Sequence, residues 1–278
     1  MSNCFSRNGR AAMFETFFGF KKTPFASSPD PKQLFESTAW SQAKARLQFL
    51  ADHRGVGLLT GDPGSGKSTA ARLWLAGLNP NLYKTIYLHW SSGSALDLLR
   101  QLARDLDLEP AHFKGDLVDQ IAEAILRLNK TKKQHPILVF DEAQLLSHAA
   151  LEQLPLLLNF EMDSCHFLTL LLIGQPLLRR TLALQLHEAL RQRIGVHYHL
   201  EGLSRSELDT YIAHQLKAAG VSTPLFDDTA RQALYQVTKG IPRKVNKLAL
   251  TALRLGALRQ AATIDETILV DAASEALL

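Results

Sequence analysis

The chain has 278 residues, of which 46% are hydrophobic and 21% charged, and a formal net charge of +4. This length allows one large domain or two smaller ones, and the composition excludes a disordered or fibrous protein. The longest mainly apolar run, Phe167 to Ile173, is far shorter than the ~20 residues of a membrane span. Cys4 and Cys165 form no metal-ligand pattern, so we expect free thiols and a cytoplasmic protein that does not enter a membrane.

The first part of the chain changes character at Met13. Residues 1–12 are small and polar, and we expect them to be disordered, which makes Met13 a candidate initiator. Five closely spaced phenylalanines follow, and aromatic side chains of this kind usually pack in a core: Phe14, Phe17, Phe18, Phe20 and Phe25. A helix predicted over residues 41–53 leads into a short apolar strand at residues 56–60.

A glycine-rich loop follows this strand and fits the phosphate-binding pattern G-x-x-x-x-G-K-[ST] without a gap. Its residues, with the one after it, are Gly61, Asp62, Pro63, Gly64, Ser65, Gly66, Lys67, Ser68 and Thr69. Residues 69–78 read as a helix, whose positive amino end favours a phosphate. Lys67 is expected to reach the β- and γ-phosphates, and the Ser68 hydroxyl to ligate Mg²⁺. The loop therefore predicts a site for ATP or GTP.

Strand and helix patterns alternate through the next hundred residues. Apolar strands are predicted at residues 85–90, 136–140, 168–173 and 196–200, with helices over 95–106 and 116–128. Strands that are apolar throughout favour a parallel sheet covered on both faces. After Leu200 the pattern is helical only, over residues 204–219, 227–238 and 242–260 and a last short helix. We place the domain boundary near Glu201.

Polar residues at two strand ends complete a candidate hydrolytic site. Asp141 and Glu142 follow an apolar strand, as in a Walker B element, where the first carboxylate holds the Mg²⁺ shell and the second polarises water. Gln175 follows the strand at residues 168–173; if that strand lies between the two motif strands, Gln175 can bond the same water. The alternative for Asp141 and Glu142 is a pair of acidic residues in the first turn of a helix. The alternative for Gln175 is an ordinary loop after a strand.

Three arginines extend this hypothesis. Arg191 and Arg193 precede the strand at residues 196–200, where they either stabilise a helix end or reach the ATP of a neighbouring subunit. Arg243 follows Pro242 in the first turn of a helix, a place where a cation is unfavourable. A phosphate bound nearby explains why a cation occupies this unfavourable position.

The carboxyl-terminal part is basic. Between Thr229 and Thr263 there are seven basic residues and no acidic one. The helix register leaves several on one side, and Lys244, Lys247 and Arg254 are candidates for sequence-independent contacts with DNA phosphates. A solvated basic face is the alternative.

Taken together, the motifs resemble the AAA+ ATPases, and most closely the ExeA (general secretion pathway protein A) group with its TnsC- and TniB-like transposition relatives. The matching segments lie between about residues 13 and 262 and include the loop at Gly61–Thr69, Asp141-Glu142-Ala143-Gln144, Gly174-Gln175-Pro176, Arg191-Gln192-Arg193-Ile194 and Gly240-Ile241-Pro242-Arg243. The resemblance implies an α/β fold: a P-loop AAA+ αβα parallel-sheet nucleotide domain at residues 13–200 and a small helical lid domain at residues 201–278. It implies that Gln175 is sensor 1, Arg193 or Arg191 the arginine finger and Arg243 sensor 2.

The resemblance also implies ATP and Mg²⁺ as cofactors, ATP hydrolysis, and a homo-oligomer in which the finger acts in trans. The ExeA group carries a membrane span and a peptidoglycan-binding region after the ATPase, whereas this chain stops at Leu278 with neither. We therefore expect an ATP-dependent oligomer on double-stranded DNA that assists a transposase. The alternatives are an ExeA-like secretion or envelope-assembly ATPase with a protein partner, and a nucleotide-switched scaffold with little turnover.

Overall fold

The structure is a computed structural model that describes residues 14–26, 34–89, 94–160 and 166–276. Residues 1–12, for which we expected disorder, lie outside these ranges. The described chain forms two compact units, one from Trp40 to Leu200 and one that combines the residues up to Ala39 with those from Glu201 onward. Each unit has its own hydrophobic core.

The Trp40–Leu200 unit is built on a five-stranded sheet with the order β2-β3-β4-β1-β5. Its strands are β1 (Val56–Gly61), β2 (Tyr83–His89), β3 (His135–Asp141), β4 (Thr169–Gly174) and β5 (Ile194–Leu200). Every pairing is parallel. The three central strands β1, β3 and β4 are buried at every position, which explains why their sequences are apolar throughout. The predicted α/β parallel-sheet fold is confirmed.

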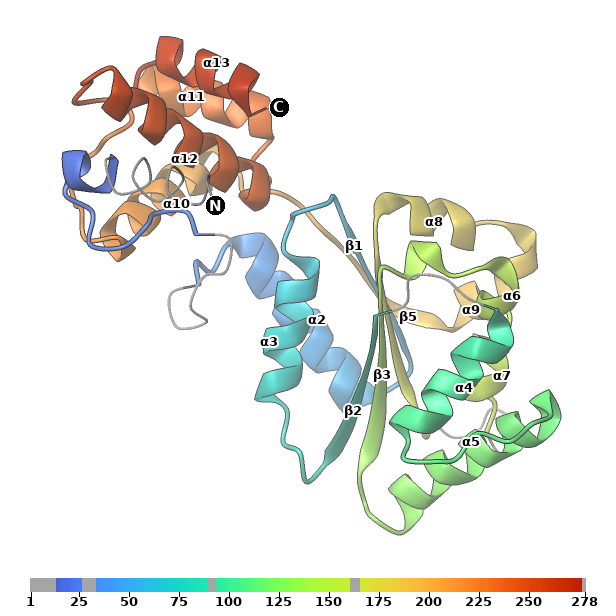
Figure 1. Cartoon of the computed structure of the whole chain (residues 1–278). Helices are drawn as coiled ribbons and strands as arrows, with labels where there is room; N and C mark the ends of the chain where they lie inside the picture. The colour runs from blue at the N-terminus through green and yellow to red at the C-terminus, as the bar shows by residue number, and fades with distance from the viewer. Residues whose placement is uncertain (1–13, 27–33, 90–93, 161–165, 277–278) are drawn as a thin grey trace, which may run out of the picture. The chain divides into compact units, whose positions relative to one another are not determined.

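Helices cover both faces of the sheet (Figure 1). One face carries α2 (Thr38–His53) and α3 (Lys67–Gly77). The other carries α4 (Ala95–Asp105), α5 (Lys114–Lys130), α6 (His148–Leu151), α7 (Leu154–Leu158), α8 (Pro176–Leu182) and α9 (Glu188–Arg193). Two 3₁₀ turns, η2 (Ala143–Leu145) and η4 (Gln185–His187), lie among them.

Sequence patterns predicted α4 and α5 but gave no bounds for the four short helices from α6 to α9. These helices have four to seven residues, too few for an apolar stripe to repeat. Pro176 begins α8 and Pro155 lies in the first turn of α7, positions that suit a residue without an N–H donor. Because α8 follows β4 at once, it fixes where the chain leaves the carboxyl end of the sheet.

The second unit is a helical bundle. It contains α10 (Arg205–Ala218), α11 (Asp228–Thr238), α12 (Pro242–Leu258) and α13 (Glu266–Glu275). Phe14 and Phe25 are each 2% exposed and belong to the core of this bundle. The structure therefore differs from our domain assignment, which placed residues 13–39 with the nucleotide domain. The aromatic side chains at the start of the chain find their apolar partners among the carboxyl-terminal helices, so the helical unit is made of both ends of the sequence.

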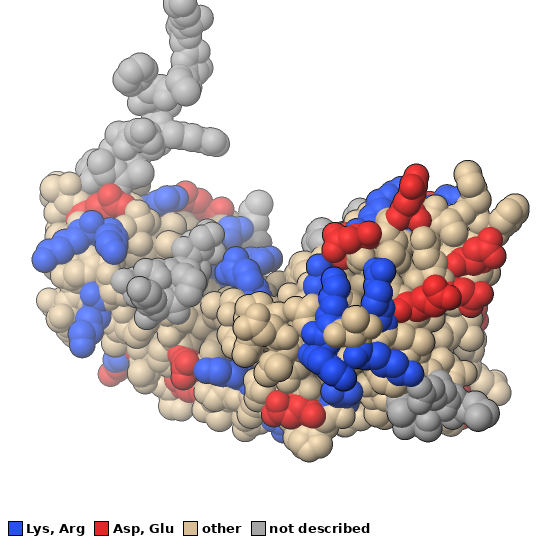
Figure 2. Space-filling model, turned by 90° about the horizontal axis from the view of Figure 1, so that it is seen from below, with Lys and Arg blue, Asp and Glu red and all other residues tan. Residues whose placement is uncertain are grey.

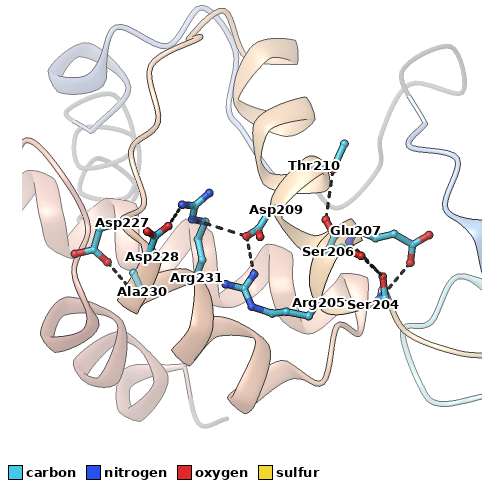
Figure 3. A network of polar contacts seen from close by, with 10 residues as sticks. All are labelled: Ser204, Arg205, Ser206, Glu207, Asp209, Thr210, Asp227, Asp228, Ala230 and Arg231. Atoms are coloured by element: carbon cyan, nitrogen blue, oxygen red, sulfur yellow. Dashed lines mark hydrogen bonds and ion pairs between the residues drawn. The ribbon is translucent and has the colours of Figure 1, made fainter.

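Polar contacts fix the helix starts of this bundle (Figure 3). Ser204 caps α10 through a capping box with Glu207, whose carboxylate also accepts a hydrogen bond from the Thr38 N–H at 2.6 Å. Partial burial raises the pKa of Glu207, but the backbone donors of Ser204 and Thr38 outweigh it and hold the pKa at about 2. Arg231 points toward Asp228 and toward Asp209. Arg259 pairs with Asp271 at 2.6 Å, so at least two of the seven lid cations are paired within the bundle.

Within the described residues we find no helix with the length and apolar character required to cross a lipid bilayer.

Candidate nucleotide site

The glycine-rich loop joins β1 to α3, as predicted. Gly64 and Gly66 have φ angles of 86° and 102°, a backbone region that glycine enters without the strain of a side chain. Gly61 is required for a different reason, because a Cβ at this position would lie only 2.6 Å from the backbone oxygen of Leu200. The loop is therefore held against β5 by a contact that only glycine allows.

Lys67 is the first residue of α3 and is 5% exposed. Its Nζ donates hydrogen bonds to the backbone oxygens of Gly61 and Asp62, each at 2.9 Å. Within the described part of the chain, the buried Oγ of Ser65 has no hydrogen-bond partner. A buried polar atom of this kind needs a partner, and the loop interior supplies none. The donors of this loop therefore fit an anion.

Two carboxylates stand at the end of β3. Asp141 is 3% exposed, and its two oxygens accept hydrogen bonds from the Glu142 N–H at 2.9 Å and from the Tyr87 hydroxyl. Burial and the neighbouring Asp141 carboxylate raise the pKa of Tyr87, so its hydroxyl stays a donor. Glu142 has a left-handed backbone, with a φ of 53°. That conformation is uncommon outside glycine and asparagine and turns the chain sharply after the strand.

Gln175 follows β4, which lies between β1 and β3 as the functional interpretation of Gln175 required. Its side-chain Nε2 lies 3.4 Å from the Glu142 carboxylate oxygen, and its backbone N–H donates to Gln144 Oε1 at 3.0 Å. Gln144 Nε2 in turn donates to the Glu142 carboxylate at 2.6 Å. Sequence analysis noted Gln144 only as part of a motif and assigned it no role.

Strand register brings these groups to one edge of the sheet. Thr60 is level with Gly174, and Phe140 is level with Leu172. The loop after β1, the carboxylates after β3 and Gln175 after β4 therefore lie next to one another at the carboxyl ends of parallel strands, where ligands bind in open α/β sheets.

Arg191 and Arg193 lie at the opposite edge. They belong to the last turn of α9, directly before β5, whose first residue pairs with Val56 at the start of β1. The six residues of β1 separate this edge from the loop by roughly 20 Å. The Nη1 atoms of Arg191 and Arg193 donate to the backbone oxygens of Ala183 and Ala189 at 3.3 and 3.2 Å. Arg191 also lines a cavity together with Thr60, the residue before the loop.

The cations of the helical unit are largely engaged there. Arg243 is exposed in the first turn of α12, which begins with Pro242, and Lys244 follows it. Lys247 Nζ donates to the backbone oxygen of Ala276 at 2.6 Å, and the Arg254 guanidinium lies 5.8 Å from the centre of the Phe14 ring. Two of the three candidate DNA contacts therefore have partners inside the unit.

Other Lys and Arg side chains gather on the sheet-bearing unit, on the face seen at the right of Figure 2. Exposed cations lie in the segments that precede β1 and β3, namely Arg54, Lys132 and Lys133. Because parallel strands start at a common edge, these segments share the edge opposite the nucleotide loop. Sequence analysis, which considered only the basic lid, did not consider them.

The sheet and the loop together define an αβα fold with a phosphate-binding loop between β1 and α3. Residues 50–182 match the family described as AAA domain. The chain is 38% identical over 244 residues to general secretion pathway protein A of Aeromonas hydrophila, a match that covers 87% of this chain and 44% of that protein. The chain thus spans less than half the length of this curated relative.

Solved structures support the same fold. Cdc6p of Pyrobaculum aerophilum aligns with a TM-score of 0.66 at 15% identity, over 91% of this chain and 70% of that one. Aeropyrum pernix ORC1, solved in complex with DNA, gives 0.62 at 17% identity, over 87% and 66%. The Thermotoga maritima RuvB Holliday junction branch migration motor gives 0.55 at 18% identity, over 85% and 68%. At these identities the likeness concerns the fold alone.

Proposed function

We propose that this chain binds ATP with Mg²⁺ and hydrolyses it to ADP and phosphate. The observation that carries the proposal is the meeting of the Gly61–Ser68 loop, the Asp141–Glu142 pair and Gln175 at one edge of the sheet. Phosphoryl transfer asks a protein mainly for positioning and for stabilisation of charge. These three segments supply backbone donors, a lysine, two carboxylates and an amide.

Each group has a role in this proposal. The N–H groups of the loop and Lys67 hold the phosphates, and Ser68 and Asp141 hold the Mg²⁺, which neutralises phosphate charge when bound. Lys67 leaves the Gly61 and Asp62 oxygens, 2.9 Å away, for a phosphate. Glu142 accepts a hydrogen bond from the attacking water and orients it. Gln175 donates its amide to the same region.

A neighbouring subunit completes the site. Arg191 and Arg193 belong to the last turn of α9, which leads into the amino end of β5, and this position favours a nucleotide held by a second copy. We propose Arg193 or Arg191 as that arginine finger, and Arg243 as a cation that senses the nucleotide from the lid. The protein then assembles as a homo-oligomer in its ATP state.

The biological role that the comparisons favour is the one of an ExeA-like ATPase with a protein partner, because the curated relative is a general secretion pathway protein. A second candidate is an ATP-dependent oligomer on double-stranded DNA that assists a transposase. It draws support from the ORC1 structure in complex with DNA, which has the same fold, and from the exposed Arg243 and the partly exposed Lys244. A third, a nucleotide-switched scaffold, differs in having little turnover without its partner.

Mixing two inactive variants tests the intersubunit site. Arg193→Ala keeps an intact loop and Lys67→Ala keeps an intact finger, so a mixture forms sites that contain both. ATP turnover of the mixture should exceed the sum of the two separate proteins, and the same holds for Arg191→Ala if Arg191 is the finger. Absence of recovery with both arginine variants, with all proteins folded, would argue against a finger in trans. ATP-dependent co-sedimentation with duplex DNA separates the transposase role from the secretion role.

A further inference from the structure

Gln144 lies between the ends of β3 and β4 and connects them. Its Oε1 accepts a hydrogen bond from the backbone N–H of Gln175 at 3.0 Å, and its Nε2 donates to the Glu142 carboxylate at 2.6 Å. Glu142 and Gln175 are 33 residues apart in the chain. One amide side chain thus spans the gap between the proposed water-orienting carboxylate and the segment that carries Gln175.

Chemistry fixes the direction of both bonds. A backbone N–H can only donate, so the Gln144 atom that faces Gln175 must be the oxygen. The nitrogen of the same amide then faces the Glu142 carboxylate, which in its ionised form can only accept. No other arrangement of this amide satisfies both neighbours. The side chain therefore holds the Glu142 carboxylate in a defined place relative to the backbone at the end of β4.

The surrounding backbone is built to admit this bridge. A Cβ at Gly174 would lie 2.8 Å from Gln144 Oε1, so the last residue of β4 leaves the room that the amide occupies. Glu142 itself is left-handed at a φ of 53°, a backbone conformation that is strained for a residue with a side chain. Strain of this kind persists where neighbouring contacts hold it, and Gln144 provides the shortest of them.

We propose that Gln144 is a positioning residue for ATP hydrolysis, which aligns the Glu142 carboxylate with the end of β4 and so couples it to Gln175. This inference rests on the proposed function. Gln144 touches neither nucleotide nor water in this account and acts through Glu142 alone. Its removal should therefore lower the rate of hydrolysis and leave the affinity for ATP unchanged.

Gln144→Leu removes both hydrogen bonds at similar volume, and Gln101→Leu serves as the matched control, because Gln101 also donates its amide to a carboxylate, that of Asp105 on α4. Single-turnover hydrolysis of radiolabelled ATP measures slow rates as well as fast ones. We expect Gln144→Leu to slow hydrolysis by roughly ten- to a hundredfold, with the dissociation constant for a fluorescent ATP analogue within about twofold of the wild type. The control should hydrolyse ATP at the wild-type rate.

Two further readouts separate positioning from a merely structural role. Adding Gln144→Leu to Glu142→Gln should cause no further loss, because the two side chains act as one unit. Gln144→Glu keeps the acceptor for the Gln175 N–H but replaces the donor to Glu142 with a second carboxylate, which repels Glu142. Its single-turnover rate should therefore be no higher than that of Gln144→Leu.

The outcomes are distinguishable. If Glu142→Gln turns over ATP like the wild type, the proposed function fails. If Glu142→Gln is inactive while Gln144→Leu is as active as the control, only the role of Gln144 is overturned. Additive losses in the double variant, or wild-type activity in Gln144→Glu, would equally overturn it.

Discussion

The hydroxyl of Tyr87 on β2 donates a hydrogen bond to the carboxylate of Asp141 at the end of β3. His89, the last residue of β2, is level with Asp141 in the parallel register, so Tyr87 reaches the carboxylate from two residues earlier in the strand. Asp141 is the proposed Mg²⁺ ligand, and partners that orient a metal ligand contribute to metal affinity. Tyr87 is therefore expected to tune the Mg²⁺ dependence of the site.

Tyr87→Phe removes this donor and keeps the ring. We expect the Mg²⁺ concentration for half-maximal ATP hydrolysis to rise by roughly tenfold, since loss of such partners typically weakens metal binding 10–100-fold. Titration of Mg²⁺ at fixed ATP gives the value. Tyr83→Phe, also on β2 but at its far end, is the matched control. An unchanged Mg²⁺ dependence in Tyr87→Phe would show that the hydroxyl does not orient Asp141.

His135, at the start of β3, should make the protein acid-sensitive. Burial lowers the pKa of His135 to about 4, and the positive charges of Arg54 and His166 add to the effect. Because the folded pKa lies below the ordinary value near 6.5, stability is full above that pH and falls as the pH drops toward 4. At pH 5 the loss is on the order of 1–2 kcal/mol.

Urea denaturation at pH 7 and pH 5 measures this loss. His135→Leu loses the contacts of the ring with Thr169 and Asn129, so it should be less stable than wild type at pH 7. The difference should shrink or reverse at pH 5, because the variant has no proton to take up there. A constant difference between wild type and variant at the two pH values would refute the prediction.

The capping box of α10 also contacts Thr38, the first residue of α2, so we expect Glu207 to stabilise both helix starts. Glu207 accepts hydrogen bonds from the N–H groups of Ser204 and Thr38 at 2.9 and 2.6 Å. Glu207→Ala should lower the free energy of unfolding by about 1 kcal/mol at pH 7. Since its pKa is held at about 2 in the fold, the contribution of its charge is present above pH 4.5 and lost as the pH falls toward 2.

Thermal denaturation of wild type, Glu207→Ala and Glu207→Gln checks this claim. Glu207→Gln keeps one uncharged acceptor oxygen, enough for one of the two N–H groups, and should lie between the other two. Equal melting temperatures for all three at pH 7 would mean that the cap contributes nothing to the bundle.

The parallel sheet and the loop could be predicted because their signals are local. Apolar runs such as Ile137–Phe140 indicate a strand that is buried on both faces of the sheet, and the glycine pattern at Gly61–Ser68 indicates a tight phosphate-binding loop. The position of β4 between β1 and β3 was only a condition in the sequence argument. The structure meets that condition, and it makes Gln175 a neighbour of Glu142.

Features that depend on distant contacts could not be predicted. Gln144 and Gln175 are 31 residues apart, and nothing in their spacing announces the hydrogen bond between them. The partners of Phe14 and Phe25 lie some 200 residues further along the chain. The aromatic cluster therefore predicted burial, but it did not show whether these side chains pack in the sheet-bearing unit or in the helical unit. The charge count of the lid likewise could not reveal that Lys247 and Arg254 have partners within it.

Comparison of wild type with Glu142→Gln and Lys67→Ala tests the central claim, ATP hydrolysis at the carboxyl edge of the sheet, most directly. ATP binding and single-turnover hydrolysis are measured on each protein with Mg²⁺ present. We expect the wild type to bind and hydrolyse, Glu142→Gln to bind with wild-type affinity but hydrolyse at least about a hundredfold more slowly, and Lys67→Ala to lose binding. Hydrolysis by Glu142→Gln at the wild-type rate, or ATP binding unaffected by Lys67→Ala, would contradict the account.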